Sequence, residues 1–166
     1  ASQVEAGINS GKKRPHLAAV LVGDDPASKA YVGHKVKACK SVGFESTIVE
    51  KGSDISEEEL LAIVNDLNND KNIDGFIVQL PLPSHIYSHK VTEAVSPSKD
   101  VDGFHPENIG RMALGLETFK PATPAGVMTL LKNYDIDTSG MHAVVIGRSD
   151  IVGNPMAALL RSNSNP

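Results

Sequence analysis

The chain has 166 residues, of which 40% are hydrophobic and 22% are charged, and its net charge is −4. This length is sufficient for one domain with a sizeable core, or for one domain and part of another. The acidic balance gives no reason to expect nucleic acid or an anionic membrane as a partner. No apolar run approaches the roughly 20 residues of a membrane-spanning helix.

Cysteine and histidine usage narrows the chemistry further. The single cysteine, Cys39, excludes an internal disulfide and fits a reducing compartment, so we expect a cytoplasmic protein in which Cys39 is a buried thiol. The six histidines show no metal-binding spacing, and we expect no metal site.

The first half of the chain alternates between strand and helix patterns. Residues 16–23 form a continuous apolar run, which is typical of a central strand buried on both faces. Asp25 and Pro26 are typical helix-start residues. The helix that they open is expected to reach about Ser41, with Gly43 as its stop.

Two further strands and a helix complete this pattern. Residues 44–50 predict a second strand, and residues 74–83 predict a third, which ends in two prolines. Between them, residues 56–70 carry an apolar stripe, with Ser56 and Glu59 at capping-box spacing. The order β-α-β-α-β predicts a parallel sheet with right-handed crossovers.

The rest of the chain predicts the beginning of a second domain. Residues 84–94 are expected to be helical, and residues 99–112 form a charged, loop-rich segment. Residues 121–134 predict a helix, with Thr123 as its cap and Pro124 at its first position.

Residues 142–162 have the pattern of a strand, a glycine-containing loop and a helix. One strand cannot make a sheet, so we expect the second domain to be incomplete and the chain to be part of a longer polypeptide.

One lysine of the first helix lies apart from the others. An α-helix turns by about 100° per residue. The resulting apolar stripe has three members: Val32, Val36 and Cys39. A solvated flank has three lysines: Lys29, Lys37 and Lys40. Lys35 instead shares the opposite flank with Ser28 and Tyr31, close to the stripe, and Tyr31 can contact it because the two are four residues apart.

Two interpretations of Lys35 remain open at this point. It could lay its aliphatic stem on apolar surface and keep its ammonium in water. Alternatively, it could be a partly desolvated lysine that serves as an acid, a base or an electrophilic donor, since desolvation brings lysines towards catalytic pKa values.

The ends of the strands bear on this choice. In an open parallel sheet, ligands bind beyond the carboxyl ends of the strands. The first strand ends just before the helix that carries Lys35, and the third ends at Gln79, where an apolar strand would continue. The amide of Gln79 could hold a lysine in place, or it could simply meet water. Leu80 and Pro81 follow, and the proline stiffens the exit as a fixed lip.

Two later segments are also candidates. Asp100 and Asp102 precede Gly103; aspartates beside glycine are commonly turn formers, but one carboxylate could face the cleft and bind an amino-pyrimidine edge. Residues 147–155 follow a strand pattern and open a helix, which favours phosphate binding at the helix N-terminus. Their glycines are not at G-x-G-x-x-G spacing, so an ordinary turn remains possible.

Five segments, in order, carry a family resemblance. They are DPASKAYVGHKVKAC, DGFIVQLPLP, SPSKDVDGFHPENIGRM, PATPAGV and GRSDIVGNPMA. With these motifs the chain resembles the bifunctional methylenetetrahydrofolate dehydrogenase/methenyltetrahydrofolate cyclohydrolase family, most closely the bacterial type. The resemblance covers nearly the whole chain.

The resemblance implies specific roles in the folate site. The Y-x-x-x-K pair falls on Tyr31 and Lys35, so Lys35 would be the main catalytic residue and Tyr31 would orient the folate ring. Gln79 would position the lysine, and Asp102 would anchor the pterin and count among the catalytic residues. Further substrate-binding residues would be these three: Ser28, Leu80 and Pro81.

The resemblance also implies a cofactor and a fold. Gly147, Arg148 and Ser149 would hold the nucleotide phosphates, with Arg148 favouring NADP over NAD. The fold would be α/β, with a parallel βαβαβ tetrahydrofolate-binding catalytic domain at 1–121. The incomplete start of a Rossmann-type NAD(P)-binding domain would follow at 122–166.

The implied activity is NADP-dependent oxidation of 5,10-methylenetetrahydrofolate, followed by hydrolysis of the methenyl product to 10-formyltetrahydrofolate. The full-length protein would be a homodimer. The chain departs from the family by lacking most of the Rossmann domain and a C-terminal segment that completes the folate site. We therefore expect the 166 residues alone to lack dehydrogenase activity.

Two other functions remain as alternatives. A non-catalytic module that binds a pterin or a nucleotide would keep its ligand after loss of Lys35. A dehydrogenase of the amino-acid or shikimate type would need arginines around the cleft for small acids, and the chain has few there.

Overall fold

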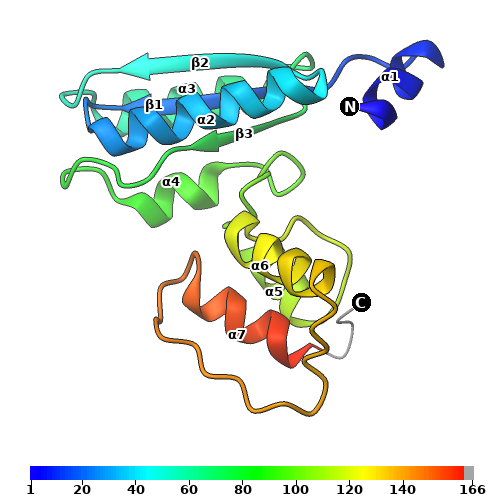
Figure 1. Cartoon of the computed structure of the whole chain (residues 1–166). Coiled ribbons are helices and arrows are strands. Elements are labelled where there is room, and N and C mark those ends of the chain that lie inside the picture. The colour runs from blue at the N-terminus through cyan, green and yellow to red at the C-terminus, as the bar shows by residue number, and fades with distance from the viewer. Residues whose placement is uncertain (163–166) are drawn as a thin grey trace. The chain divides into compact units, whose positions relative to one another are not determined.

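The computed structural model describes residues 1–162, and the chain divides into two compact units. The first unit is Ala1–Lys99, and the second begins at Asp100. Figure 1 shows the elements of both. Each unit is described by itself below.

The first unit is built on a three-stranded parallel sheet. Its strands are β1 (His16–Val22), β2 (Glu45–Lys51) and β3 (Gly75–Val78), in the spatial order β2-β1-β3. The central strand β1 is the continuous apolar run, and five of its seven residues are buried. The predicted parallel βαβαβ pattern is confirmed, but β3 ends at Val78 and does not extend to residue 83.

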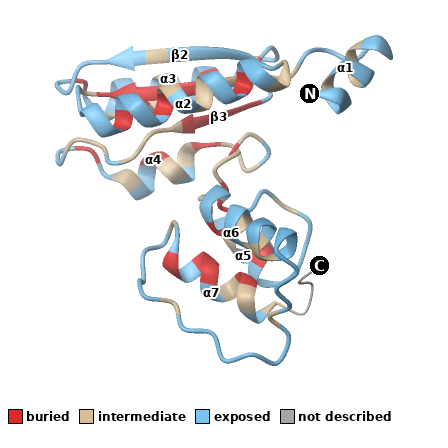
Figure 2. Cartoon of the chain, in the orientation of Figure 1, coloured by how far each residue is buried: buried red, intermediate tan, exposed pale blue. Residues whose placement is uncertain are grey.

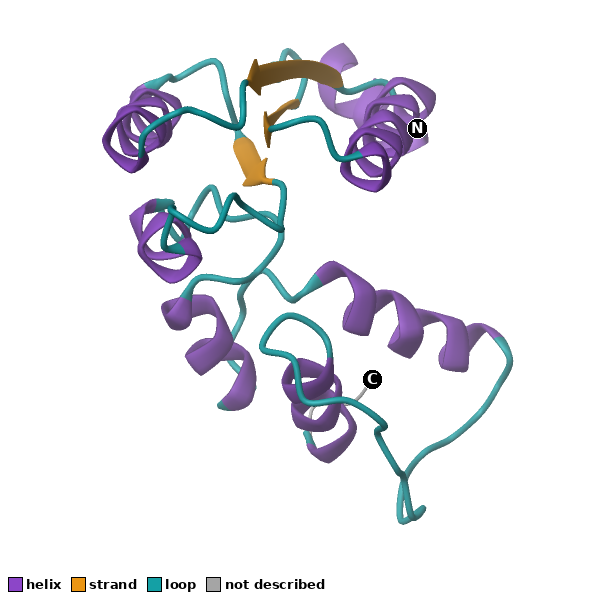
Figure 3. Cartoon of the chain, turned by 90° about the vertical axis from the view of Figure 1, so that its left-hand side faces the viewer, coloured by secondary structure: helices purple, strands orange, loops and turns teal. Residues whose placement is uncertain are grey.

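Helices cover both faces of this sheet. The crossover helices are α2 (Pro26–Val42) and α3 (Glu57–Asn69). The chain moves from β1 to β2 on one side and returns to β3 on the other, so two right-handed crossovers place their helices on opposite faces. Figures 1 and 3 show α2 and α3 on opposite sides of the strands. Two shorter helices flank this core: α1 (Ser2–Asn9) and α4 (Ser88–Ala94).

The hydrophobic core lies between the sheet, α3 and α4 (Figure 2). Its fully enclosed centre includes Val20, Leu60, Val64 and Phe76, all at 0–1% exposure. The edge strand β2 contributes little to this core, since six of its seven residues are exposed. The unit therefore has a well-packed face beneath β1 and β3.

The capping box of α3 forms as the sequence predicts. The Ser56 hydroxyl accepts from the Glu59 N–H (3.1 Å), and the Glu59 carboxylate accepts from the Ser56 N–H (3.0 Å). These bonds satisfy two backbone donors that the helix cannot pair internally. Together they fix where α3 begins.

We expect Ser56→Ala to lower the free energy of unfolding by about 1 kcal/mol, because an alanine cannot accept from the free N–H groups of the first turn. Urea denaturation would measure the change. Ser56→Asp, which keeps an acceptor, serves as the control and should stay close to the parent. Equal stability of the alanine variant would contradict the role of this cap.

The second unit contains three helices among its described residues: α5 (Pro106–Ala113), α6 (Ala122–Asn133) and α7 (Gly153–Arg161). The sequence predicts a loop-rich segment at residues 99–112, and this is wrong for its second half, which forms most of α5. It begins where the side chain of His105 accepts from the Glu107 N–H (3.0 Å) and Pro106 occupies the first turn.

Helix α6 corrects the predicted cap. Pro121 is its N-cap, so Thr123 and Pro124 lie inside the first turn and Thr123 does not cap the helix. Proline is tolerated there because the first-turn N–H groups have no intrahelical acceptor.

Residues 142–146 do not form the predicted strand, and Ile146 is 99% exposed. A strand is stabilised by the backbone of a neighbour. Within residues 1–162, the paired strands all belong to the first unit. The α/β class holds, with the NAD(P)-domain pattern only partly formed.

Candidate functional site

The topology of the sheet identifies the edge at which a ligand is expected. The first crossover leads from β1 to β2 on one side, and the second leads from β2 past β1 to β3 on the other side. The direction of the strand order therefore reverses between β1 and β3. Ligands of open α/β sheets bind beyond the carboxyl ends of the strands at such a switch point. Gln79 lies there: its N–H donates to the Val20 carbonyl (2.9 Å).

The amino end of α2 lies at the same edge of the first unit. Asp25 caps the helix, and its carboxylate accepts from the Ser28 N–H (2.7 Å). This bond holds the pKa of the Asp25 carboxyl below its usual value. Ser28 is 6% exposed, so its hydroxyl is enclosed at the start of the helix. The cap predicted from Asp25 and Pro26 is confirmed.

The burial of α2 separates Lys35 from the other lysines, as the helical periodicity predicts. Lys35 is half-buried, whereas Lys29, Lys37 and Lys40 are exposed. The Lys35 Nζ atom lies 5.4 Å from the centre of the Tyr31 ring, a cation–π distance. Because Tyr31 is one turn nearer the amino end of α2, the Lys35 side chain extends towards the ligand-binding edge of the sheet.

The solvated flank of α2, which carries Lys29, has an ion pair typical of protein surfaces. Lys29 forms an ion pair with Asp24 (2.7 Å), and the pair raises the pKa of Lys29 and lowers that of Asp24. On the buried stripe, desolvation raises the pKa of the Cys39 thiol. The expectation that Cys39 is a buried, unbridged thiol is confirmed.

Gln79 has an unmatched acceptor. Its Nε2 donates to the Leu80 carbonyl (2.7 Å), while Oε1 is enclosed and has no hydrogen-bond partner among the described residues. An enclosed carbonyl without a donor is costly. A lysine ammonium or a ligand N–H would satisfy it. In the predicted lip after Gln79, the peptide bond between Leu80 and Pro81 is cis.

The aspartates of the second unit have different surroundings. Asp100 is 4% exposed, and its Oδ2 accepts from the His105 N–H and from Asn108 Nδ2, both at 2.8 Å. Asp102 is half-buried in the turn that follows. Asp100 is therefore the carboxylate that shapes the loop, and Asp102 lies within that loop.

The turn before α7 packs closely against the first residues of the helix. Gly147 has a φ of 142°, and a Cβ on Gly153 would lie 2.5 Å from the Gly147 carbonyl oxygen. Only glycine at 153 lets the helix approach this backbone so closely. The Ser149 hydroxyl accepts from the Val152 and Gly153 N–H groups, both at 3.2 Å, and Arg148 is exposed. The exposed guanidinium beside a helix N-terminus fits the phosphate of a nucleotide cofactor.

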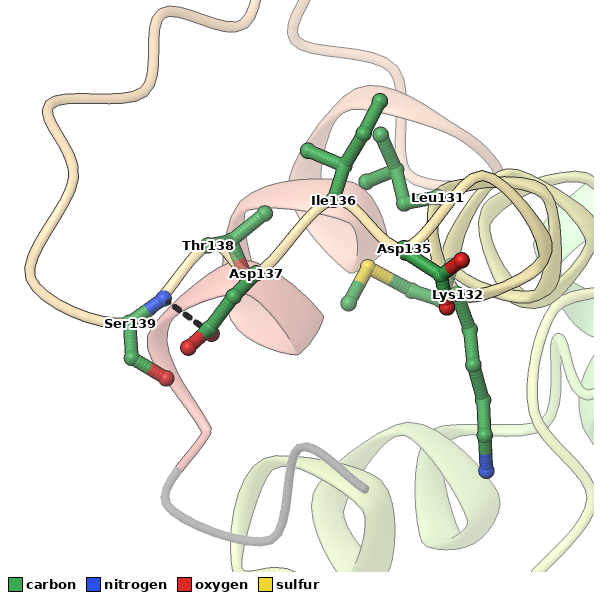
Figure 4. A pocket seen from close by; sticks show the side chains of 8 residues that line it. Leu131, Lys132, Asp135, Ile136, Asp137, Thr138 and Ser139 are labelled. Atoms are coloured by element: carbon green, nitrogen blue, oxygen red, sulfur yellow. Dashed lines mark hydrogen bonds between the residues drawn. The ribbon is translucent and has the colours of Figure 1, made fainter.

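Two hollows in the second unit are lined by other residues. A pocket of about 290 Å³ lies where α6 ends, and Figure 4 shows Asp137 there, accepting from the Ser139 N–H (2.9 Å). A second hollow, of about 650 Å³, lies between α5, α6 and α7. The predicted site residues line neither, so the candidate site rests on the sheet edge and on hydrogen bonding.

The structure groups the predicted residues by unit. Ser28, Tyr31 and Lys35 share the flank of α2, and Gln79 with its following lip belongs to the same unit. Asp102 and the 147–149 turn belong to the second unit. Within residues 1–162, no cluster of three acidic, histidine or cysteine side chains could hold a metal ion, and no helix could span a membrane.

Sequence reasoning missed two polar residues, Asn108 and Thr118, that are hydrogen-bonded to the Asp100 side chain or to each other. Asn108 is 3% exposed on α5, and its Oδ1 accepts from the Thr118 hydroxyl (2.6 Å). The only sequence signal was Pro106, which is typical of a first helical turn and would have predicted the helix that carries Asn108.

Family models match both parts of the chain. The model described as the catalytic domain of tetrahydrofolate dehydrogenase/cyclohydrolase matches residues 1–102, and that of its NAD(P)-binding domain matches residues 121–165. The bifunctional protein FolD of Cytophaga hutchinsonii is 59% identical over 165 residues, covering 99% of this chain and 57% of the relative. The chain thus spans a little over half the length of such curated relatives.

Solved structures point to the same family as the family models. The bifunctional dehydrogenase/cyclohydrolase FolD of Campylobacter jejuni is 49% identical with a TM-score of 0.92, covering 96% of this chain and 56% of that chain. The Trypanosoma brucei dehydrogenase-cyclohydrolase, complexed with NADP and an inhibitor, is 33% identical with a TM-score of 0.91, covering 96% and 55%.

Proposed function

Because the chain belongs to the tetrahydrofolate dehydrogenase/cyclohydrolase family, we propose that the full-length protein carrying these residues performs both reactions of that name. It oxidises 5,10-methylenetetrahydrofolate to the methenyl form and hydrolyses this to 10-formyltetrahydrofolate. The observation that supports this most directly is Lys35, half-buried and extended over Tyr31 within the segment that matches the catalytic-domain model.

The oxidation requires alignment more than proton transfer. The methylene carbon between N5 and N10 of the folate gives up a hydride, which a bound nicotinamide accepts, and the carbon becomes a methenyl cation. The contribution of this chain is to hold the pterin in register. In our proposal the Tyr31 ring packs on the folate, and the Asp102 carboxylate accepts from the amino-pyrimidine edge.

The hydrolysis is the step that needs Lys35. Water adds to the methenyl carbon, the bond from this carbon to N5 breaks, N5 gains a proton, and one further proton is released. The Lys35 side chain mediates the transfer of the proton that the attacking water gives up. We assign Gln79 Oε1, which has no hydrogen-bond partner among the described residues, as the acceptor that Lys35 reaches when folate is bound, so that Gln79 holds the lysine at the reacting carbon.

The nucleotide assignment rests on the second unit. Residues 121–165 match an NAD(P)-binding domain. We assign Gly147, Arg148 and Ser149 to the phosphates and favour NADP, because the Arg148 guanidinium is exposed and can pair with a 2′-phosphate. We also retain as proposals a domain boundary after Pro121, a cytoplasmic location and a homodimer.

The test compares the full-length protein with the 166-residue chain. With methylenetetrahydrofolate and NADP, the full-length protein should form NADPH, and NAD should support a slower reaction. The 166-residue chain should form none, because residues 142–146 make no strand of a nicotinamide-binding sheet. Turnover by the short chain would contradict the need for a complete second domain, and inactivity of the full-length protein with both nucleotides would contradict the proposed function.

A further inference from the structure

The loop that carries Asp102 is held by a polar network in the second unit, two of whose three residues are buried. The network consists of Asp100, Asn108 and Thr118. Asp100 and Asn108 are 4% and 3% exposed, and Asn108 Nδ2 donates to Asp100 Oδ2 at 2.8 Å. The Thr118 hydroxyl donates to Asn108 Oδ1 at 2.6 Å. The three residues come from the start of the loop, from α5 and from the segment after α5.

The bonds of this network close the loop from both sides. Asp100 Oδ2 also accepts from the His105 N–H (2.8 Å). One carboxylate oxygen therefore links Asp100, at the start of the loop, to His105, the residue before α5. The Asp100 carbonyl accepts from the Gly103 N–H (3.2 Å). Asp102 thus lies on the arc 100–105, whose two ends are joined through the single buried carboxylate of Asp100.

The placement of Asn108 makes this connection rigid. Met112, one turn further along α5, is 3% exposed, so this side of the helix is anchored in the interior of the unit. A buried carboxylate with two donors is stable only while both donors stay in place. Loss of Asn108 would leave the carboxylate with one donor, and the arc could then move.

We propose that Asp100, Asn108 and Thr118 are positioning residues that set the geometry of Asp102 for its ligand. This inference rests on the proposed function, in which Asp102 binds the pterin. The ligand edge that fits a fixed, half-buried carboxylate is a planar pair of N–H donors, as in an amino-pyrimidine. The network acts through Asp102 and makes no contact with the folate itself.

The network predicts a defect in substrate binding. In the full-length protein, Asn108→Ala should raise the KM for the folate substrate roughly ten- to a hundredfold, because small displacements of a binding group cost this much. The kcat at saturating folate should fall far less, since the Lys35 chemistry is unchanged. Thr118→Val, which removes the hydroxyl, should raise the KM by a smaller factor. Thr118→Ser, which keeps the hydroxyl, should have the KM of the parent.

A double-mutant cycle separates positioning from a general structural role. Once Asp102→Asn has removed the binding carboxylate, adding Asn108→Ala should raise the KM no further, because residues that act through one another are not additive. Additive losses would overturn the proposal. A KM unchanged in Asn108→Ala, with only the melting temperature lowered, would also overturn it.

The cycle also distinguishes this inference from the function on which it rests. If Asp102→Asn leaves the folate KM unchanged, the role of Asp102 is wrong, whatever the network does. If Asn108→Ala does not fold, the Thr118→Val and Thr118→Ser pair decides. Equal KM values for that pair would overturn the positioning role, and a raised KM in the valine variant alone would support it.

Discussion

Lys35→Met is expected to reduce the cyclohydrolase rate of the full-length protein by roughly 10²–10⁴-fold, the range for loss of a general acid–base residue. Methionine keeps the helix propensity and most of the apolar stem of lysine but has no proton to exchange. Folate binding should persist, since Tyr31 and Gln79 remain. The decay of methenyltetrahydrofolate absorbance measures the rate, in a buffer that limits spontaneous hydrolysis.

The matched control is Lys37→Met on the same helix. Lys37 is exposed on the solvated flank, so its substitution changes the charge equally without touching the Tyr31 contact. Its hydrolysis rate should equal that of the parent. If Lys35→Met also hydrolyses at the parental rate while it binds folate, Lys35 is a solvated surface lysine, and a non-catalytic pterin-binding module becomes the better interpretation of this domain.

Local patterns predicted the features that depend on neighbours in sequence. The Ser56–Glu59 capping box, the Asp25 cap and the stop at Gly43 each involve groups a few residues apart, and all three form. The separation of Lys35 from the other lysines follows from helical periodicity alone, and the burial confirms it. Such features are predictable because one helix or turn determines them.

Features that need distant partners were not predictable in the same way. Residues 142–146 have a strand pattern, but a strand requires a neighbour, and none pairs with them in residues 1–162. The Asn108–Thr118 bond depends on how α5 meets the segment after it, which no periodicity specifies. That Gln79 Oε1 is enclosed without a partner among residues 1–162 likewise follows only from packing, although Gln79 itself was predicted as a site residue.

Gly103 is expected to be one of the least tolerant positions of the second unit. Its φ is 70°, a conformation that costs other residues about 1–2 kcal/mol. A Cβ there would lie 2.6 Å from the Lys120 carbonyl carbon and 2.7 Å from the Pro121 nitrogen, so backbone atoms would have to move. We therefore expect Gly103→Ala to lower the free energy of unfolding by about 2–4 kcal/mol, as measured by urea denaturation of the full-length protein.

Gly110→Ala provides the control within the same unit. Gly110 is helical in α5, and a Cβ at this position would have no atom within 4 Å, so the alanine should stabilise the helix by about 0.5–1 kcal/mol. Opposite signs for two glycine substitutions seven residues apart would show that backbone crowding, and not glycine loss as such, decides the outcome. A Gly103→Ala variant as stable as the parent would mean that the Asp102 loop is not held against residues 119–121. The loop would then be free to adjust to its ligand, and a fixed carboxylate could not account for pterin recognition.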